Sequence, residues 1–299
     1  MHRAASNHRV ITRWMLSCVF GFALIVSAHA RQAELEATDV DEAEAAQAPS
    51  ETVPPRPAEP EPGAPLARND DLAFVRRRGV ELYERHQASL LALDAAQEVG
   101  LDENAPDGWI TVQEGSGYRV RFIAQCEEGP CSVIDVFIDN DRLNAQALYP
   151  PAILKDEQAL AWRAKELVFA TQTVMCDTPY NAVVLPPQED GEEWTVYLIA
   201  QPDEADVVAV GGHVRVFLDP VSDTVYRAED LSTSCLLTRR NPDQPSIGLA
   251  YAQSPMPAET HVFTSLLDQV VFYVGTGAGV FLVNGDEVRL MSEQEQAGM

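Results

Sequence analysis

The sequence lacks the short motifs of the common hydrolases. It contains no H-E-x-x-H, no G-x-S-x-G and no S-x-x-K, so the signatures of zinc metalloproteases and serine hydrolases are missing. Beyond residue 30 only three histidines remain, His86, His213 and His261. The two closest cysteines are spaced C-x4-C, not the C-x2-C typical of zinc sites, and no histidine lies near a cysteine. The sequence therefore predicts neither a metal nor a cofactor.

Basic charge is also scarce. The chain has 21 basic and 46 acidic residues, a net charge of −25. Phosphate backbones and anionic membrane surfaces repel such a protein, so nucleic acid is not an expected partner. The densest basic cluster is Arg76-Arg77-Arg78, followed by Arg85. Because acidic residues surround it, we expect this cluster on the solvated face of a helix.

The N-terminal segment predicts export. Residues 1–13 carry three arginines and no acid, residues 14–28 are uncharged, and Ala28-His29-Ala30 fits a small-x-small cleavage site. The apolar run falls short of the ~20 residues that span a bilayer. We expect a signal peptide over residues 1–30, cleaved after Ala30, a periplasmic or secreted protein, and no stable membrane span after cleavage.

A spacer is predicted after the signal peptide. Residues 31–68 hold seven of the twenty prolines, many Glu and Ala, and almost no large apolar residue. Such a segment buries too little surface to offset the entropy of ordering, so we expect it to be disordered.

Four cysteines follow, and an even number in an exported chain favours disulfides. We predict Cys126–Cys131, which closes a hairpin, and Cys176–Cys235, which ties a helix end to a later strand. If Cys126 faces Cys131, Ala124 pairs with Val133, Phe122 with Asp135 and Val120 with Phe137. One face of that hairpin is then apolar, with Asp135 as the exception.

The hydrophobic pattern over residues 69–299 predicts an α+β fold. Residues 69–97 have helical spacing, with Gly79 weakening the middle, and residues 156–176 predict a long core helix that Asp156 caps and Cys176 ends. Period-two alternation predicts antiparallel strands, and a Pro-rich loop is expected over about 238–260. The chain closes with a hairpin at Asn284-Gly285. Residues 69–299 form one domain, or two with a boundary near 150. The strands are expected at residues 109–113, 117–126, 131–139, 181–186, 193–201, 206–210, 213–219, 224–230, 270–276 and 279–291.

The stretch "VVAVGGHVRVFLDP", residues 207–220, sets a histidine directly after two glycines. Because only two residues separate the two runs that read as strands, we expect a hairpin turn at Gly211-Gly212. Alternation then places His213, Arg215 and Asp219 on one face. These three residues are the candidate catalytic set, because an arginine beside a histidine can bind a carboxylate or phosphate.

The stretches "YNAVVLP", "GGH-x-RV", "LSTSC" and "HVF-x-SL" resemble features of uncharacterised secreted bacterial proteins. The order of a helix followed by antiparallel strands is also similar to PepSY and cystatin-like modules. The second resemblance implies protease inhibition in some members.

These observations predict an exported, non-enzymatic binding or accessory protein of the bacterial envelope, whose partner is an envelope or extracellular protein. Two alternatives stay open. One is an envelope hydrolase that uses His213, Arg215 and a carboxylate such as Asp219. The other is a module like the protease inhibitors. A pocket that gathers those side chains would favour the hydrolase, whereas a sheet edge or an exposed apolar patch would favour binding.

Overall fold

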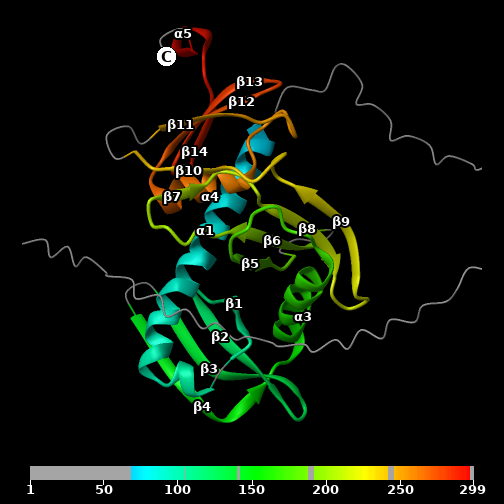
Figure 1. The fold of residues 1–299 in the computed structure, drawn as a ribbon. Helices are drawn as coiled ribbons and strands as arrows, with labels where there is room; N and C mark the ends of the chain where they lie inside the picture. The colour runs from blue at the N-terminus through cyan, green and yellow to red at the C-terminus, as the bar shows by residue number, and fades with distance from the viewer. Residues whose placement is uncertain (1–68, 105, 140–141, 188–191, 242–245, 297–299) are drawn as a thin grey trace, which may run out of the picture. The chain divides into compact units, whose positions relative to one another are not determined.

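The computed structural model describes residues 69–104, 106–139, 142–187, 192–241 and 246–296 (Figure 1). The predicted signal peptide and spacer, residues 1–30 and 31–68, lie outside the described residues. Within the described ranges the chain combines helices with mostly antiparallel sheets, as an α+β fold requires. No helix in this part of the chain is long and apolar enough to cross a membrane.

One long helix, α1 (Asn69–Glu98), contributes to two hydrophobic cores. Its first half buries Val75 and Leu82 in one core, and its second half supplies a row of alanines to the other. Gly79, which we expected to weaken this helix, is required by its packing against α4 (Glu259–Asp268): a Cβ on Gly79 would stand 2.5 Å from the Cβ of Val262. The helix therefore crosses α4 at a distance that only glycine allows.

The first sheet is an antiparallel meander of four consecutive strands. Its inner face packs on the alanine row of α1, mainly through Val120, Phe122 and Val136. The sequence predicted three of these strands and missed the fourth, because the fourth is exposed along most of its length and shows no alternation. The strands are β1 (Gly108–Glu114), β2 (Gly117–Cys126), β3 (Gly129–Asp139) and β4 (Arg142–Ile153).

Helix α3 (Asp156–Thr171) packs on a second antiparallel sheet through Trp162 and Val168. The opposite face of that sheet is covered by α1 and α4, where Tyr197 and Ile199 are buried. Because both faces are covered, β5 and β6 are buried almost throughout and read as continuous apolar runs. The strands, in sheet order, are β5 (Tyr180–Leu185), β6 (Trp194–Ala200), β8 (Val214–Asp219) and β9 (Thr224–Asp230).

The remaining strands form a two-stranded sheet and a four-stranded sheet, and α4 lies among them in the sequence. Strand β11 is parallel to β12 and the other pairs are antiparallel. Short strands β10 and β11 lie where a Pro-rich loop was expected, so that prediction was wrong in part. The elements are β7 (Val207–Ala209) with β10 (Leu237–Arg239), the sheet β11 (Ser246–Ala250), β12 (Val271–Thr276), β13 (Gly279–Asn284) and β14 (Glu287–Leu290), and the short helices α2 (Leu101–Asn104) and α5 (Glu293–Gln296).

Both predicted disulfides are confirmed. The Cα atoms of Cys126 and Cys131 are 5.9 Å apart, and those of Cys176 and Cys235 are 5.1 Å apart. The hairpin register predicted from the first bridge is wrong, because Cys126 pairs with Gly129 and not with Cys131. A two-residue turn precedes Gly129 and a bulge follows it, so Asp135 lies opposite Arg121.

The predicted ends of the core helix are also wrong. Lys155, and not Asp156, is the N-cap, its side chain makes no capping hydrogen bond, and the helix ends at Thr171. The hydroxyl of Thr171 donates to the carbonyl oxygen of Leu167, and the chain then leaves the helix to bring Cys176 to its partner. Hydrophobic spacing continued past the helix end and so did not reveal it.

The expectation of a solvated arginine cluster was wrong for two of its members. Arg78 and Arg85 are buried, and both contact the carboxylate of Glu81. Arg78 also pairs with Glu192, and Arg85 donates to the carbonyl oxygen of Thr111. The acidic residues that suggested a solvated face are therefore in part the internal partners of these arginines.

Candidate functional site

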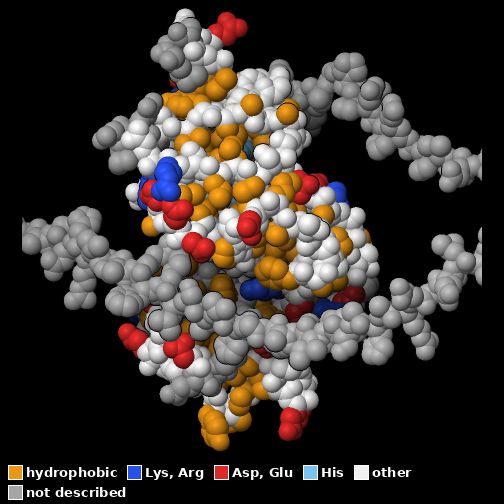
Figure 2. All heavy atoms as spheres, in the orientation of Figure 1, with side chains coloured by type: hydrophobic (Ala, Val, Ile, Leu, Met, Phe, Trp, Pro, Cys, Tyr) orange, Lys and Arg blue, Asp and Glu red, His pale blue; other side chains and the backbone are white. Residues whose placement is uncertain are grey.

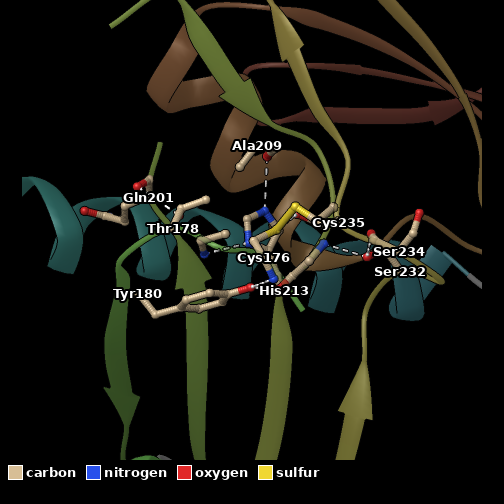
Figure 3. Close-up of a disulfide and its surroundings, with 12 residues drawn as sticks. Cys176, Thr178, Tyr180, Gln201, Ala209, His213, Ser232, Ser234 and Cys235 are labelled. Atoms are coloured by element: carbon tan, nitrogen blue, oxygen red, sulfur yellow. Dashed lines mark hydrogen bonds between the residues drawn. A yellow bond between two sulfur atoms is a disulfide. The ribbon is translucent and has the colours of Figure 1, made fainter. Parts of the chain in front are cut away.

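The Gly211-Gly212-His213 segment lies against the Cys176–Cys235 disulfide (Figure 3). It is not a hairpin turn, because β7 pairs with β10 while β8 pairs with β6 and β9. Gly212 has a φ of 86°, and a Cβ there would overlap the sulfur of Cys176. The disulfide and the backbone conformation together explain this glycine.

Hydrogen bonds hold the same segment in place. The N–H of Gly212 donates to Ser232 Oγ over 2.6 Å, and the hydroxyl of Tyr180 donates to the carbonyl oxygen of Gly212 over 2.8 Å. That hydroxyl also accepts from the N–H of Cys176 over 3.0 Å. Both the N–H and the C=O group of Gly212 are thus hydrogen-bonded to side chains of the protein.

Both ring nitrogens of His213 are occupied. Nδ1 accepts from the N–H of Ala200 over 3.2 Å, and Nε2 lies 3.1 Å from the carbonyl oxygen of Ala209 (Figure 3). Nε2 therefore carries the hydrogen. Burial lowers the pKa of His213 from 6.5 to about 4, so the ring is neutral at physiological pH. It acts as a structural link between β6 and the end of β7.

Arg215 and Asp219 are engaged elsewhere. Arg215 pairs with Glu229 and with the buried carboxylate of Glu259 at the start of α4. Asp219 accepts from the N–H of Val221 and the hydroxyl of Ser222 in the turn after β8. Within the described residues no contact joins His213, Arg215 and Asp219, so the arrangement gives no support to a hydrolase built on them.

The other two histidines have structural partners too. His86 Nδ1 lies 3.2 Å from Nδ2 of Asn181, and His261 Nδ1 accepts from the N–H of Ala258 over 2.9 Å. Burial lowers the pKa of His86 to about 4 and that of His261 to about 3. In the described ranges no three His, Cys, Asp or Glu side chains are grouped closely enough to hold a metal ion.

Strand β4 is exposed along most of its length. It pairs with β3 on one side, and no described strand pairs with its other side. An unpaired strand edge presents free N–H and C=O groups, and proteins usually protect such edges with charge, with proline or with a bulge. From Leu143 to Ile153 the strand has no charged residue, and Arg142 is the only one it contains. The edge from Leu143 to Ala147 therefore carries none of these protections, whereas Pro150 and Pro151 interrupt the edge farther along the strand.

A bulge in β4 projects next to this edge. Ala147 pairs with Ile134 and Ala152 pairs with Ser132, so residues 148–151 have no partner in β3. Tyr149 in this bulge is 100% exposed. Figure 2 shows hydrophobic side chains protruding at the end of the molecule where β4 lies in Figure 1. The Cys126–Cys131 bridge braces the adjoining hairpin, since Cys131 pairs with Ile153.

Comparison with known proteins gives no relative: no family model, no curated protein and no solved structure matches the chain. The resemblance to secreted bacterial proteins and to PepSY and cystatin-like modules therefore stays a prediction. The candidate site rests on the geometry of β4 alone.

Proposed function

We propose that the chain is an exported, non-enzymatic binding or accessory protein of the bacterial envelope, and that it docks a partner protein on β4. The observation that supports this function most is Tyr149, a wholly exposed aromatic side chain beside a long strand edge without charge. Aromatic side chains are enriched among the residues that dominate protein interfaces. An open strand edge adds main-chain hydrogen bonds to such a contact.

The charge of the chain argues for a protein partner. At a net charge of −25, most of the surface repels nucleic acid and anionic lipid. Residues 142–153 contain no acidic residue, so a partner protein with a neutral surface can bury this strand without burying a carboxylate. The occupant we infer is an extended segment of another protein that pairs with the outer edge of β4 and receives the ring of Tyr149 in an apolar pocket. Leu143, 47% exposed on the same strand, extends the apolar contact.

The experiment first identifies partner proteins by crosslinking and then tests their binding to variants of β4. The full-length protein is expressed in its host with a photo-crosslinking phenylalanine derivative at position 149, and crosslinked proteins from the envelope fraction are identified by mass spectrometry. Tyr226, which is 56% exposed on β9 among charged neighbours, is the matched control position. Each protein captured at position 149 and not at 226 is then purified, and its affinity for the chain is measured.

We expect Tyr149→Ala and Ala145→Pro each to weaken the reconstituted complex at least tenfold, because one removes the anchor and the other distorts the edge. Tyr226→Ala should leave the affinity unchanged. If Tyr149→Ala and Tyr226→Ala bind equally well, the proposed surface is incorrect. If position 149 crosslinks only to a second copy of the chain, and sedimentation shows a dimer, the surface mediates self-association and the proposal of a different partner protein is wrong. A captured protease that the chain inhibits would identify the inhibitor alternative.

A further inference from the structure

A groove of about 610 Å³ separates the first sheet from the start of α3. It lies over the face of the meander that α1 does not cover, where Arg119 and Arg121 of β2 project. The opposite wall comes from the start of α3. Grooves of this volume are typical of sites for small molecules. The lining residues are Val112, Gln113, Glu114, Arg119, Arg121, Ile153, Lys155, Asp156, Glu157 and Gln158.

A buried carboxylate organises the floor of this groove. Asp135 is 5% exposed and accepts from the hydroxyl of Ser132 over 2.6 Å. Its Oδ2 lies 3.1 Å from Nη1 of Arg119 and 3.4 Å from Nη2 of Arg121. Arg119 is held further by Glu114, to which its Nη2 donates over 2.7 Å. The guanidinium of Arg119 is therefore fully engaged and fixed in position.

Arg121 is held much less completely. Its side chain is only 14% exposed, yet its one ion pair in the described structure is the long contact to Asp135. Its Nε is buried and has no hydrogen-bond partner. Buried polar groups are almost always hydrogen-bonded, so the protein satisfies this guanidinium incompletely. Arg121 lines the groove, and a ligand there would meet its terminal Nη groups, because Nε is enclosed. A guanidinium offers a planar fork that matches the two oxygens of a carboxylate.

The charge balance of the groove restricts the ligand. Arg119, Arg121 and Lys155 provide three positive charges, and Glu114, Asp156 and Glu157 provide three negative charges. Asp135, which pairs with both arginines, adds a fourth negative charge beneath them. Lys155 is exposed, and none of the ion pairs found among the described residues involves it. This excess of negative charge disfavours a phosphate dianion and favours a ligand that carries an amine as well as a carboxylate. We propose that the groove binds a short peptide, or a compound built like one, through a carboxylate on Arg121 and Lys155.

The Nε–Hε signal of Arg121 reports on any contact made at the same guanidinium. The full-length protein is labelled with ¹⁵N-arginine, the Arg121 side-chain signal is assigned from its loss in Arg121→Lys, and four probes are titrated: alanyl-alanine, alanyl-alanine amide, acetate and inorganic phosphate. We expect alanyl-alanine to shift this signal saturably and the amide to bind at least tenfold more weakly. The tightly held Arg119 signal should move less. Equal shifts with the dipeptide and its amide, or no shift with any probe, would overturn the proposal.

Variants give the second measurement, by equilibrium dialysis with labelled alanyl-alanine. Arg121→Gln and Lys155→Gln should each weaken binding at least tenfold, and Arg121→Lys, which keeps the charge and the fold, should restore part of it. Arg239→Gln is the control, since Arg239 is 63% exposed on β10 outside the groove. Acetate and phosphate that bind as tightly as the dipeptide would show a general anion site and refute the peptide class. If Arg239→Gln lost as much affinity for alanyl-alanine as Arg121→Gln, binding would not depend on the groove and the proposal would be refuted.

Discussion

Gly212 stands so close to Cys176 that its own Cβ would overlap the sulfur of the disulfide. The backbone of Gly212 is also left-handed, with a φ of 86°. Two independent requirements therefore meet at one residue: an L side chain would strain the backbone and would collide with the Cys176–Cys235 bridge. The disulfide and the glycine form one structural unit at the end of β7.

Gly212→Ala should consequently destabilise the protein. We expect a loss of about 2–4 kcal/mol in the free energy of unfolding, which combines left-handed strain with overpacking against the sulfur. Urea unfolding at pH 7 measures it. Gly277→Ala is the control, because a Cβ there meets nothing within 4 Å and its φ is not positive. Equal stability of the two variants would contradict the role given to Gly212.

The residues around this glycine also show what sequence patterns predict and what they do not. The number of cysteines and the export context predict that disulfides form, and the place of Cys126 and Cys131 beside one hairpin loop predicts which cysteines pair. Strands β5 and β6 follow from their apolar segments. The pairing of β7 with β10 does not follow, because it joins short segments about 30 residues apart. In sequence, a Gly-Gly pair between two strands looks the same whether it forms a hairpin turn or packs against a disulfide.

The candidate surface and groove were beyond sequence reasoning for a related physical reason. Strand β4 is an exposed edge, so nothing selects alternation along it, and it gave no strand signal. Asp135 was visible as the polar exception on an apolar face, but only the true register places it between Arg119 and Arg121. Charges that find partners across a sheet cannot be told from solvated charges by composition.

The buried carboxylate of Glu81 should be essential for the stability of α1. It lies between Arg78 and Arg85, whose side chains are 5% and 3% exposed. Glu81→Gln leaves two buried guanidinium groups without their shared anion, and removing one partner of a buried pair costs about 3–5 kcal/mol. Glu98→Gln, an exposed change at the end of the same helix, should be neutral within about 0.5 kcal/mol. Thermal and urea unfolding would show the difference, and similar losses in both variants would argue against it.

The two disulfides should differ in their contribution to stability. Cys126 and Cys131 enclose a separation of 5 residues, whereas Cys176 and Cys235 enclose 59. Loop-closure entropy predicts about 2 kcal/mol for the first bridge and about 4 kcal/mol for the second. The double variants Cys126→Ser/Cys131→Ser and Cys176→Ser/Cys235→Ser test this by urea unfolding in the absence of reductant. A larger loss from the hairpin pair would refute the ranking.

The three buried histidines predict a loss of stability in mild acid. Burial lowers the pKa of His86 and His213 from 6.5 to about 4, and that of His261 to about 3. The unfolded chain therefore binds more protons than the folded one below pH 6.5. Stability is fully present above this value and falls as the pH drops toward 4. Each fully shifted imidazole contributes a slope of about 1.4 kcal/mol per pH unit.

One carboxyl group opposes this trend. Burial raises the pKa of Asp268 from 3.8 to about 6, so its protonation favours the folded state as the pH falls below 6. The net slope should thus be smaller than that of the three imidazoles alone, and steepest at about pH 5.5, where the imidazoles of the unfolded chain are almost fully protonated. Urea unfolding at intervals from pH 7.5 to 4.5 measures it. His86→Gln, which keeps an acceptor for the amide of Asn181, should flatten the slope, and Asp268→Asn should steepen it below pH 6. A stability that stays constant between pH 7.5 and 5, or two variants that change the slope in the same direction, would show that these groups do not govern the response.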